Sequence, residues 1–496
     1  MKNSHNLKYL LSPWINYIPD IFFKKMTMNS HKVNNGDLFI AINGNKFHGT
    51  QFISHAISRG AQAVLVETNK KNNHGYFKIL KKVYIIYFLK LSQFISAIAS
   101  RFFKHPGKKM VLIGVTGTNG KTTVTYLIAQ WINFLGGKSG IIGTLGNGIY
   151  NSLVQTNNTT DSAIKIQKLL DYFLTKKIKL VAIEVSSHAI QQNRVKDVPF
   201  TIGILTNISQ DHLDYHGNMN KYTSVKWNFF SKNNINRKIF NFNDLVKWKK
   251  LKKITYTKDV LISIKMNDSY LYSKYWLNAT QIIYHKDGFN ISFNSYWGSG
   301  IIYSHLLGNF NVKNLLLAFS CLLSLGFSKN DLLSTSKQLK SAYGRMQKIK
   351  KTGFPTIIID YAHTPDALKN VLKTLKYCYK TKIWCVFGCG GERDQSKRKK
   401  MGTIAEKLAN EVIITNDNPR NENPLVIIQD ILKNCKRKIT VIMEREEAIR
   451  YAISSANKSD IILIAGKGHE NYQIIGNKYI NYSDQNTVFH ILGISS

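Results

Sequence analysis

A glycine-rich segment between two apolar runs carries the clearest chemical signal in the sequence. The segment GVTGTNGKTT spans residues 114–123, follows the strand-like run MVLIGV (110–115) and leads into the helix-like run TVTYLIAQWINFL. Backbone N–H groups of such a turn, together with the positive end of the helix dipole, bind polyphosphate. Lys121 is expected to reach the terminal phosphates, and the Thr122 hydroxyl to bind magnesium. The predicted nucleotide contacts are Gly117, Thr118, Asn119, Gly120, Lys121, Thr122 and Thr123.

Three more polar residues stand near apolar runs in the same part of the chain. Glu184 ends the strand-like run LVAIE, His212 follows another strand-like run, and Lys226 lies on a helix-like run. Because magnesium prefers oxygen ligands, a carboxylate and an imidazole after neighbouring strands suit a magnesium site beside the phosphate loop. A lysine with a neutral amine can react with carbon dioxide to give a carbamate, an anionic oxygen ligand. Each residue alone is more often a core or solvated side chain, so the prediction depends on their combination.

Four strand-like runs in the last third of the chain each end in a polar segment. The runs at 356–360, 383–388, 411–415 and 460–466 lead into DYAHTP, GCGGERD, NDNPR and GKGHE. Helix-like runs separate them, which is typical of a parallel sheet with helices on both faces. Such sheets bind ligands at the carboxyl ends of their strands. We therefore expect the four segments to face one ligand.

Together these motifs resemble the Mur ligase family over nearly the whole chain. TGTNGKT, EVSSH, DHLDYHG and KYTSVKW stand at the expected places, and Val115, which breaks the usual P-loop pattern, belongs to the form found in Mur-type ligases. The resemblance implies an ATP-dependent amide ligase that works through an acyl phosphate, with ATP and Mg²⁺ as cofactors. It implies catalytic roles for Lys121, Glu184, His212, Lys226 and Arg345, and metal binding by Thr122, Glu184, His212 and the carbamate of Lys226.

The resemblance also implies the remaining nucleotide contacts. GNFNVKNLLLAF (308–319) is similar to the adenine-side motif, in which Asn311 and Asn314 are the matching residues. GRMQ (344–347) supplies Arg345 near the γ-phosphate, with Gln347 where the family usually has Glu. Asp360 is expected to contact the ribose or to order the closed site.

For the carboxylate substrate, the resemblance implies UDP-N-acetylmuramoyl-dipeptide. The family usually has Asp-Ser-Arg where this chain has Asn29-Ser30-His31. Arg194 is the natural partner for an anion. The positions that match the family's contacts to this substrate are Met28, Ser30, Asn45, Lys46, Phe47, Asn158, Thr159, Thr160, Ser186, Gln192 and Arg194.

The amine is implied to be meso-diaminopimelate, which differs from lysine by one distal carboxylate. A planar guanidinium binds a carboxylate through two parallel hydrogen bonds, and Glu470 is expected to pair with an ammonium group. A buried Arg420 left unpaired by lysine would disfavour lysine, and lysine-adding relatives lack this arginine. The matching positions are Arg393, Asp417, Asn418, Pro419, Arg420, Gly466 and Glu470.

The chain length fits roughly three domains of about 150 residues each. We expect a UDP-binding N-terminal domain over 1–106, a central ATP-binding domain over 107–342 and a C-terminal amino-acid-binding domain over 343–496. The expected fold class is α/β, with a small N-terminal α/β domain and a Rossmann-like C-terminal domain. The central domain is expected to be a P-loop-type, mostly parallel sheet with helices on both faces. Residues 231–300 resemble strands and hairpins without a motif.

The formal net charge of +40 would suit nucleic acid or a membrane surface. However, the lysines are spread along the chain beside Asn and Ile, as codon drift in an AT-rich genome produces. The five cysteines form no CxxC pair, which favours reduced thiols in a cytoplasmic protein. No signal peptide is visible, and the apolar stretch 83–103 resembles a strand and an amphipathic helix. We expect small-molecule substrates, no nucleic acid, no membrane insertion and a monomer.

Three alternatives remain open. Another ligase of the superfamily, such as folylpolyglutamate synthase or a lysine-adding Mur ligase, would differ at DNPR and in the N-terminal domain. A nucleic-acid-stimulated P-loop ATPase would account for the charge. A degenerate non-enzyme is disfavoured by the intact Lys121, Glu184, His212, Lys226 and Arg420.

Overall fold

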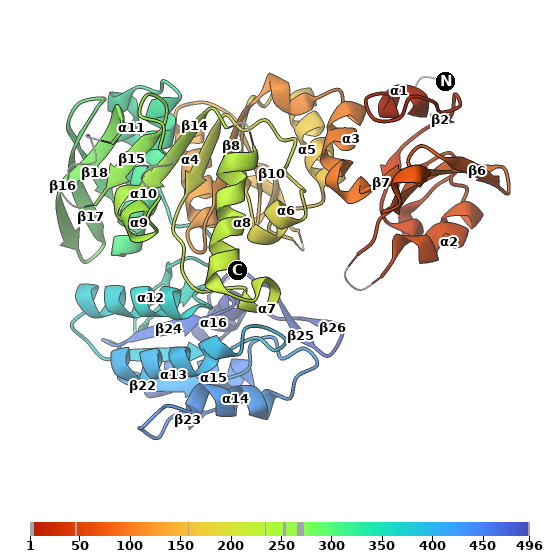
Figure 1. Cartoon of the computed structure of the whole chain (residues 1–496). Helices are drawn as coiled ribbons and strands as arrows, with labels where there is room; N and C mark the ends of the chain where they lie inside the picture. The colour runs from red at the N-terminus through yellow and green to blue at the C-terminus, as the bar shows by residue number, and fades with distance from the viewer. Residues whose placement is uncertain are drawn as a thin grey trace.

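Three sheets of five, eleven and six strands follow one another along the chain and form three α/β domains. The structure is a computed structural model that describes residues 4–44, 47–156, 158–233, 235–250, 254–264 and 272–494. The N-terminal domain stands to one side of the central domain, and the C-terminal domain packs beneath the central one (Figure 1). The predicted fold class is confirmed.

The N-terminal sheet has the order β3-β4-β5-β7-β6, and only β6 runs antiparallel to its neighbour. β5 is apolar on both faces because both are covered. The stretch 83–103 forms a strand and a helix, as predicted. The elements are β1 (His5–Asn6), α1 (Leu7–Leu11), β2 (Phe22–Phe23), β3 (Met26–Thr27), η1 (Ser30–Lys32), β4 (Leu38–Ala41), α2 (Ile53–Ser58), β5 (Ala63–Thr68), β6 (Phe77–Leu80), β7 (Val83–Leu89) and α3 (Ile95–Phe102).

The central sheet has the order β11-β10-β9-β12-β8-β13-β14-β15-β16-β17-β18. The strands from β9 to β16 pair in parallel, and antiparallel strands flank them at both ends. Its strands are β8 (Val111–Thr116), β9 (Ser139–Gly143), β10 (Gly146–Ile149), β11 (Ser152–Val154), β12 (Leu180–Glu184), β13 (Ile202–Leu205), β14 (Arg237–Asn241), β15 (Val260–Ser263), β16 (Tyr275–His285), β17 (Gly288–Ser295) and β18 (Gly300–Ser304).

The register of β8 decides which loops meet at the edge of this sheet. β8 lies between β12 and β13, with Gly114 opposite Ile183 on one side and Gly203 on the other. The ends of these three strands therefore bring together the glycine-rich loop, Glu184 and the segment that contains His212. The helices are α4 (Lys121–Phe134), α5 (Ala163–Thr175), α6 (Ser187–Gln191), α7 (Leu213–His216), α8 (Met219–Lys232), α9 (Phe242–Lys247), α10 (Asn309–Ser324) and α11 (Lys329–Thr335).

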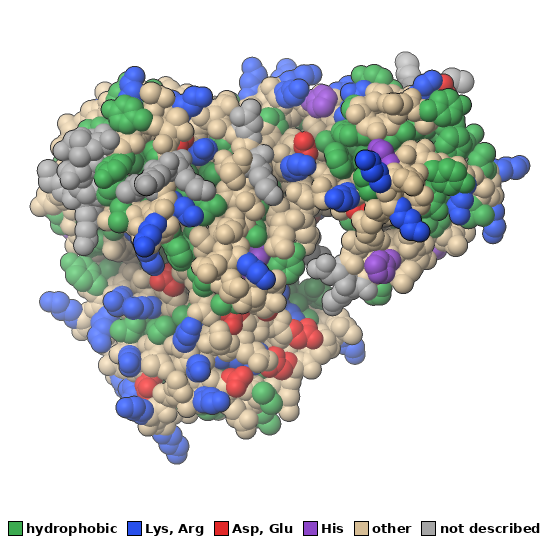
Figure 2. Space-filling view, viewed as in Figure 1, with side chains coloured by type: hydrophobic (Ala, Val, Ile, Leu, Met, Phe, Trp, Pro, Cys, Tyr) green, Lys and Arg blue, Asp and Glu red, His purple; other side chains and the backbone are tan. Residues whose placement is uncertain are grey.

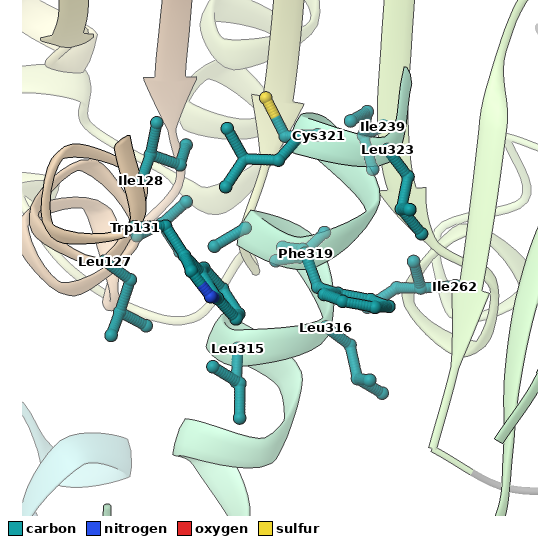
Figure 3. Close-up of a cluster of buried hydrophobic side chains, with 14 of the residues drawn as sticks. Leu127, Ile128, Trp131, Ile239, Ile262, Leu315, Leu316, Phe319, Cys321 and Leu323 are labelled. Carbon is teal, nitrogen blue, oxygen red and sulfur yellow. The ribbon is translucent and has the colours of Figure 1, made fainter. Parts of the chain in front are cut away.

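A buried apolar cluster fixes α4, the helix that the glycine-rich loop begins. Trp131 of α4 packs against Phe319 of α10, with ring centroids 5.8 Å apart, and leucines of both helices and isoleucines of α4, β14 and β15 surround them (Figure 3). The Trp131 indole N–H donates to the Leu332 carbonyl at 3.1 Å. This packing holds the N-terminus of α4 at the sheet edge.

The C-terminal sheet has the order β19-β20-β24-β21-β22-β23 and is parallel except for β19. α12, α13 and α14 cover one face, and α15 and α16 cover the other, as predicted. The elements are β19 (Gln347–Ile349), β20 (Thr356–Asp360), α12 (Pro365–Cys378), β21 (Ile383–Phe387), α13 (Ser396–Leu408), β22 (Glu411–Ile414), α14 (Pro424–Leu432), β23 (Thr440–Val441), α15 (Arg445–Ser455), β24 (Ile461–Ala465), β25 (Tyr472–Ile475), β26 (Lys478–Asn481) and α16 (Asp484–Leu492).

The surface agrees with the spread of lysines in the sequence. On the face shown in Figure 2, Lys and Arg side chains are scattered over all three domains without one continuous basic patch. Within the described part of the chain, no helix has both the length and the apolar character needed to cross a bilayer.

A buried ion pair joins α15 to α16 behind two loops of the C-terminal domain. Arg445 donates to both oxygens of Asp484, at 2.7 and 2.8 Å, and both side chains are buried. The same guanidinium donates to the carbonyls of Ala465 and Asn416. One cation therefore holds the residues that precede Gly466 and Asp417.

Asp484→Asn is expected to destabilise the protein by about 3–5 kcal/mol, because it leaves the buried Arg445 without a counter-charge. The midpoint of urea unfolding measures the change. As a control, Glu411→Gln breaks the exposed pair with Lys382 and should alter stability by less than about 1 kcal/mol. Equal midpoints for the two variants would contradict the prediction.

Candidate active site

The glycine-rich loop has the backbone that its sequence requires. Gly117 and Gly120 have positive φ angles, and a Cβ on Gly120 would lie 2.5 Å from the Asn314 side-chain oxygen. The Lys121 ammonium donates to the carbonyls of Gly117 at 3.0 Å and Thr118 at 2.9 Å, so it folds over the loop. Burial lowers the pKa of Lys121, and the Glu184 and Asp211 carboxylates oppose that shift.

A cavity of about 190 Å³ lies between the central and C-terminal domains and begins at this loop. It combines predicted residues from both domains, which the sequence separates widely. Gly117 and Lys226 are not among its lining residues. The predicted residues that line it are Thr118, Asn119, Gly120, Lys121, Thr122, Thr123, Thr159, Glu184, His212, Asn311, Asn314, Arg345 and Asp360.

Glu184 is the centre of a hydrogen-bond network in this cavity. It is buried, and it accepts from the Thr122 hydroxyl at 2.9 Å and from the Thr144 hydroxyl and N–H at 3.0 and 2.8 Å. Arg345 of the C-terminal domain donates to the same Thr122 hydroxyl at 3.2 Å. A carboxylate, a hydroxyl and a guanidinium thus converge next to the phosphate loop.

His212 caps the N-terminus of α7 in a left-handed conformation beside Asp211. Burial lowers the pKa of His212 to about 3, and the Asp211 carboxylate, 3.4 Å away, opposes the shift. The imidazole is therefore neutral at physiological pH and has a lone pair to offer. His188 packs edge-on at 4.9 Å, and burial lowers its pKa to about 4.

Lys226 lies beneath the phosphate loop. Its side chain is 1% exposed, its amine donates to the Gly117 carbonyl at 2.8 Å, and it sits 4.7 Å from the Tyr222 ring centroid. Burial and the nearby Lys121 charge hold the pKa of Lys226 well below its ordinary value. A neutral amine is the form that reacts with carbon dioxide.

The donor atoms in this region fit magnesium. The Thr122 and Glu184 oxygens are 2.9 Å apart at the cavity wall, and His212 lines the same cavity. Among the described residues, no three His, Cys, Asp or Glu side chains could hold a metal ion by themselves. A complete site would therefore draw on hydroxyl, carbamate or phosphate oxygens.

The nucleotide-side residues are held by short contacts. Asn314 donates to the Asn311 side chain at 3.1 Å, and Asn311 donates to the Leu307 carbonyl at 2.8 Å. Asp360 accepts from the Met346 N–H at 2.7 Å, and burial raises its pKa against the opposing charge of Arg345. Asp360 thus orders the turn that presents Arg345.

Four of the residues predicted for the muramoyl-peptide form one cluster near Glu184. The Thr160 hydroxyl donates to the Glu184 carbonyl at 2.7 Å and accepts from the Ser186 N–H at 3.0 Å. Arg194 donates to the Thr160 carbonyl at 2.7 Å and to Gln192 at 2.6 Å, and no carboxylate forms an ion pair with it in the described structure. This guanidinium is placed to receive an anion.

The other residues of this set are more dispersed. The Thr159 hydroxyl lies 3.2 Å from the Thr144 hydroxyl, and Asn158 belongs to the same loop. Met28 and Ser30 lie in the separate N-terminal domain, where Ser30 is buried at the start of η1, while Phe47 is exposed. Asn45 and Lys46 fall outside the described residues.

The residues predicted for the amine form a rim along the carboxyl ends of β21, β22 and β24. Arg420 has a φ of 55° and donates to the carbonyls of Gly391 at 2.9 Å and Asn418 at 3.3 Å. Pro419 lies between Asn418 and Arg420 in the chain. A Cβ on Gly466 would lie 2.7 Å from an Asp417 carboxylate oxygen, so these two loops are in close contact. Arg393 is exposed, and its charge contributes to the lowered pKa of His188 in the central domain.

Glu470 has a partner that the sequence did not indicate. Its Oε2 accepts from the buried Lys467 ammonium at 3.1 Å and from the Asn418 amide at 3.0 Å. Lys467 stands in the GKGHE motif, three residues before Glu470. This spacing was the only feature of the sequence that could have indicated their ion pair.

Contacts between domains supply the other residues that sequence reasoning missed. Asp211 faces His363 of the C-terminal domain at 3.7 Å, and Gln210 donates to Asp394 at 3.0 Å. Asp211 and His363 stand in the motifs DHLDYHG and DYAHTP, but nothing in the sequence pairs them. The central and C-terminal domains are therefore closed on one another around the cavity.

Family models match this chain in three successive segments. The Mur ligase family catalytic domain matches residues 23–103, the Mur ligase middle domain matches 115–322, and the Mur ligase glutamate ligase domain matches 344–468. These segments cover most of the three sheets, in order.

Relatives extend the similarity over the full length. A UDP-N-acetylmuramoyl-L-alanyl-D-glutamate–2,6-diaminopimelate ligase of Buchnera aphidicola subsp. Acyrthosiphon pisum is 53% identical over 98% of both chains. The ligase of that name from Buchnera aphidicola subsp. Schizaphis graminum is 51% identical over 98% of this chain and 99% of its own. A solved structure of a ligase of that name superposes with a TM-score of 0.67 at 32% identity, over 99% of both chains. With its cavity, loop and three domains in this arrangement, the chain belongs to the Mur ligase family.

Proposed function

We propose that this protein is the ATP-dependent ligase that adds meso-diaminopimelate to UDP-N-acetylmuramoyl-L-alanyl-D-glutamate in peptidoglycan precursor synthesis. The observation that carries the proposal is the interdomain cavity in which the phosphate loop, Thr122 and Glu184 meet Arg345. The names of the relatives at 51% and 53% identity support the choice of substrates.

The first step is phosphoryl transfer to the substrate carboxylate. Lys121 leaves the loop carbonyls to contact the terminal phosphates, and Arg345 neutralises charge on the γ-phosphate. Thr122, Glu184, His212 and carbamylated Lys226 would hold Mg²⁺, which supplies further charge neutralisation when bound. Arg194, Thr160 and Ser186 hold the muramoyl-peptide so that its γ-carboxylate oxygen attacks the γ-phosphorus, which gives an acyl phosphate and ADP. The remaining nucleotide contacts are Asn311, Asn314 and Asp360.

The second step is attack by the amine. The Arg420 guanidinium binds the distal carboxylate of diaminopimelate, with Arg393, Asp417 and Asn418 beside it, and Glu470 receives an ammonium group. The α-amine at the other end attacks the acyl carbon, and phosphate leaves with the oxygen that came from the carboxylate. The closed arrangement of the two domains excludes water from the acyl phosphate.

The finer assignments belong to the same proposal. Met28, Ser30, Asn45, Lys46 and Phe47 would contact the UDP portion in the N-terminal domain. We place the divisions between domains at 106/107 and 342/343, in the gaps between the segments that the family models match. Five free thiols among the described residues suit the reducing cytoplasm, and we propose that the protein acts there as a monomer.

An amine panel tests the proposal. Phosphate release from ATP is measured with the UDP-muramoyl-dipeptide and with diaminopimelate, lysine, D-alanyl-D-alanine or no amine. Diaminopimelate is expected to exceed lysine in kcat/KM by about a hundredfold or more. Preference for lysine would contradict the amine assignment. Hydrolysis that DNA or RNA stimulates, without dependence on the dipeptide, would contradict the proposed function as a whole.

A further inference from the structure

Tyr361 has no role in the scheme above, yet it lies between the nucleotide cavity and the amine rim. It follows β20 directly and lines the cavity. The GKGHE segment approaches it so closely that a Cβ on Gly468 would lie 2.8 Å from the Tyr361 Cβ. The two halves of the site therefore touch the same side chain.

The face of the Tyr361 ring carries Arg345. The guanidinium carbon lies 4.2 Å from the ring centroid, and the guanidinium donates to the Thr122 hydroxyl at 3.2 Å. A cation over an aromatic face is attracted by the ring quadrupole. The buried Nε of Arg345 has no hydrogen-bond partner in the described structure, so the ring is a main restraint on its orientation.

The hydroxyl of Tyr361 reaches the other half of the site. It donates to Glu470 Oε1 at 3.4 Å, while Glu470 Oε2 is held by Lys467 and Asn418. Burial and the Glu470 charge hold the pKa of Tyr361 well above its ordinary value, so the phenol keeps its proton and acts as a donor. Tyr361 therefore contacts the Glu470 oxygen that has no other hydrogen-bond partner among the described residues.

We infer that Tyr361 is a positioning residue that orients Arg345 with its ring and Glu470 with its hydroxyl. It thereby links the nucleotide subsite to the carboxylate that receives the amine. The inference rests on the proposed function and adds one residue to it. Because the two contacts use different parts of one side chain, substitution can remove them separately.

Tyr361→Phe keeps the ring and removes the hydroxyl. It is expected to raise the KM for diaminopimelate about tenfold and to leave the KM for ATP within about twofold. Tyr361→Leu removes both contacts, so both KM values should rise about tenfold. Tyr451→Phe, which alters an exposed tyrosine on α15, is the matched control and should change neither. Phosphate release is measured with each substrate varied in turn, together with thermal unfolding.

An unchanged KM for diaminopimelate in Tyr361→Phe, or equal rises for both substrates, would overturn the inference. A uniform fall in kcat with a lowered unfolding temperature would also overturn it, because a purely structural residue behaves in that way. Calorimetric ATP binding gives a second readout that needs no amine, in which Tyr361→Leu weakens binding and Tyr361→Phe does not. Equal weakening would overturn the inference, whereas a wild type inactive with diaminopimelate would contradict only the proposed function.

Discussion

Lys226→Ala is expected to lower the rate of ligation by about a thousandfold. Removing one fixed group that stabilises charge in a closed active site typically slows a reaction by about this factor. The variant removes the only atom at this position that can form a carbamate. The buried amine lies against the Gly117 carbonyl and its pKa is held well below its ordinary value, which is the physical reason for expecting a carbamate there. Phosphate release with saturating substrates measures the loss.

Chemical rescue separates a lost ligand from a damaged fold. A small carboxylate such as formate can occupy the space that the alanine leaves and return an anionic oxygen, so it should restore part of the activity. Lys221→Ala, on the exposed side of the same helix, is the matched control and should behave as wild type. Full activity in Lys226→Ala without any additive would remove the carbamate from the mechanism.

Arg420→Ala should raise the KM for diaminopimelate about a hundredfold and change the KM for ATP by less than about threefold. The guanidinium now bonds only to two backbone carbonyls in the described structure, so a substrate carboxylate would be its first acidic partner. Its loss should also erase most of the preference for diaminopimelate over lysine. Varied-substrate kinetics with both amines measure the two effects.

Two further variants sharpen this test. Arg420→Lys keeps the charge but loses the paired hydrogen bonds, and it should recover only part of the affinity. Arg450→Ala, an exposed arginine of α15, should leave both KM values unchanged. Parallel rises in the KM for ATP and for diaminopimelate in Arg420→Ala would count against a specific contact with the amine.

The strands of the C-terminal domain could be predicted nearly to the residue. TIIID and DIILIAG are continuous apolar runs because both faces of a covered parallel sheet are buried. The insertion of β24 between β20 and β21 could not be predicted, because strand order depends on pairing between residues far apart in the chain.

The candidate site likewise has a part that could be predicted from the sequence and a part that could not. The glycine-rich loop could be found because Gly117 and Gly120 meet a local backbone need, and Lys121 follows directly. The contact of Arg345 with Thr122 joins residues 223 positions apart, and the Asp211–His363 approach crosses a domain boundary. Such contacts depend on how the domains close, which no local pattern encodes.

The sequence could not decide whether the Lys226 and Lys467 side chains are solvated or buried, and the structure shows that both are buried. Lys226 lies on a helix-like run and Lys467 in the polar segment GKGHE, where a solvated lysine is the ordinary outcome, yet both are buried against named acceptors. Composition could not distinguish them from the many exposed lysines of this chain.

The central claim is that ATP activates the substrate carboxylate as an acyl phosphate before the amine attacks. The most direct measurement uses UDP-muramoyl-dipeptide carrying heavy oxygen in both positions of its γ-carboxylate, turned over with ATP and diaminopimelate. We predict that each phosphate released contains one heavy oxygen and that the other stays in the new amide. Phosphate without the label, or label recovered in AMP, would contradict the account.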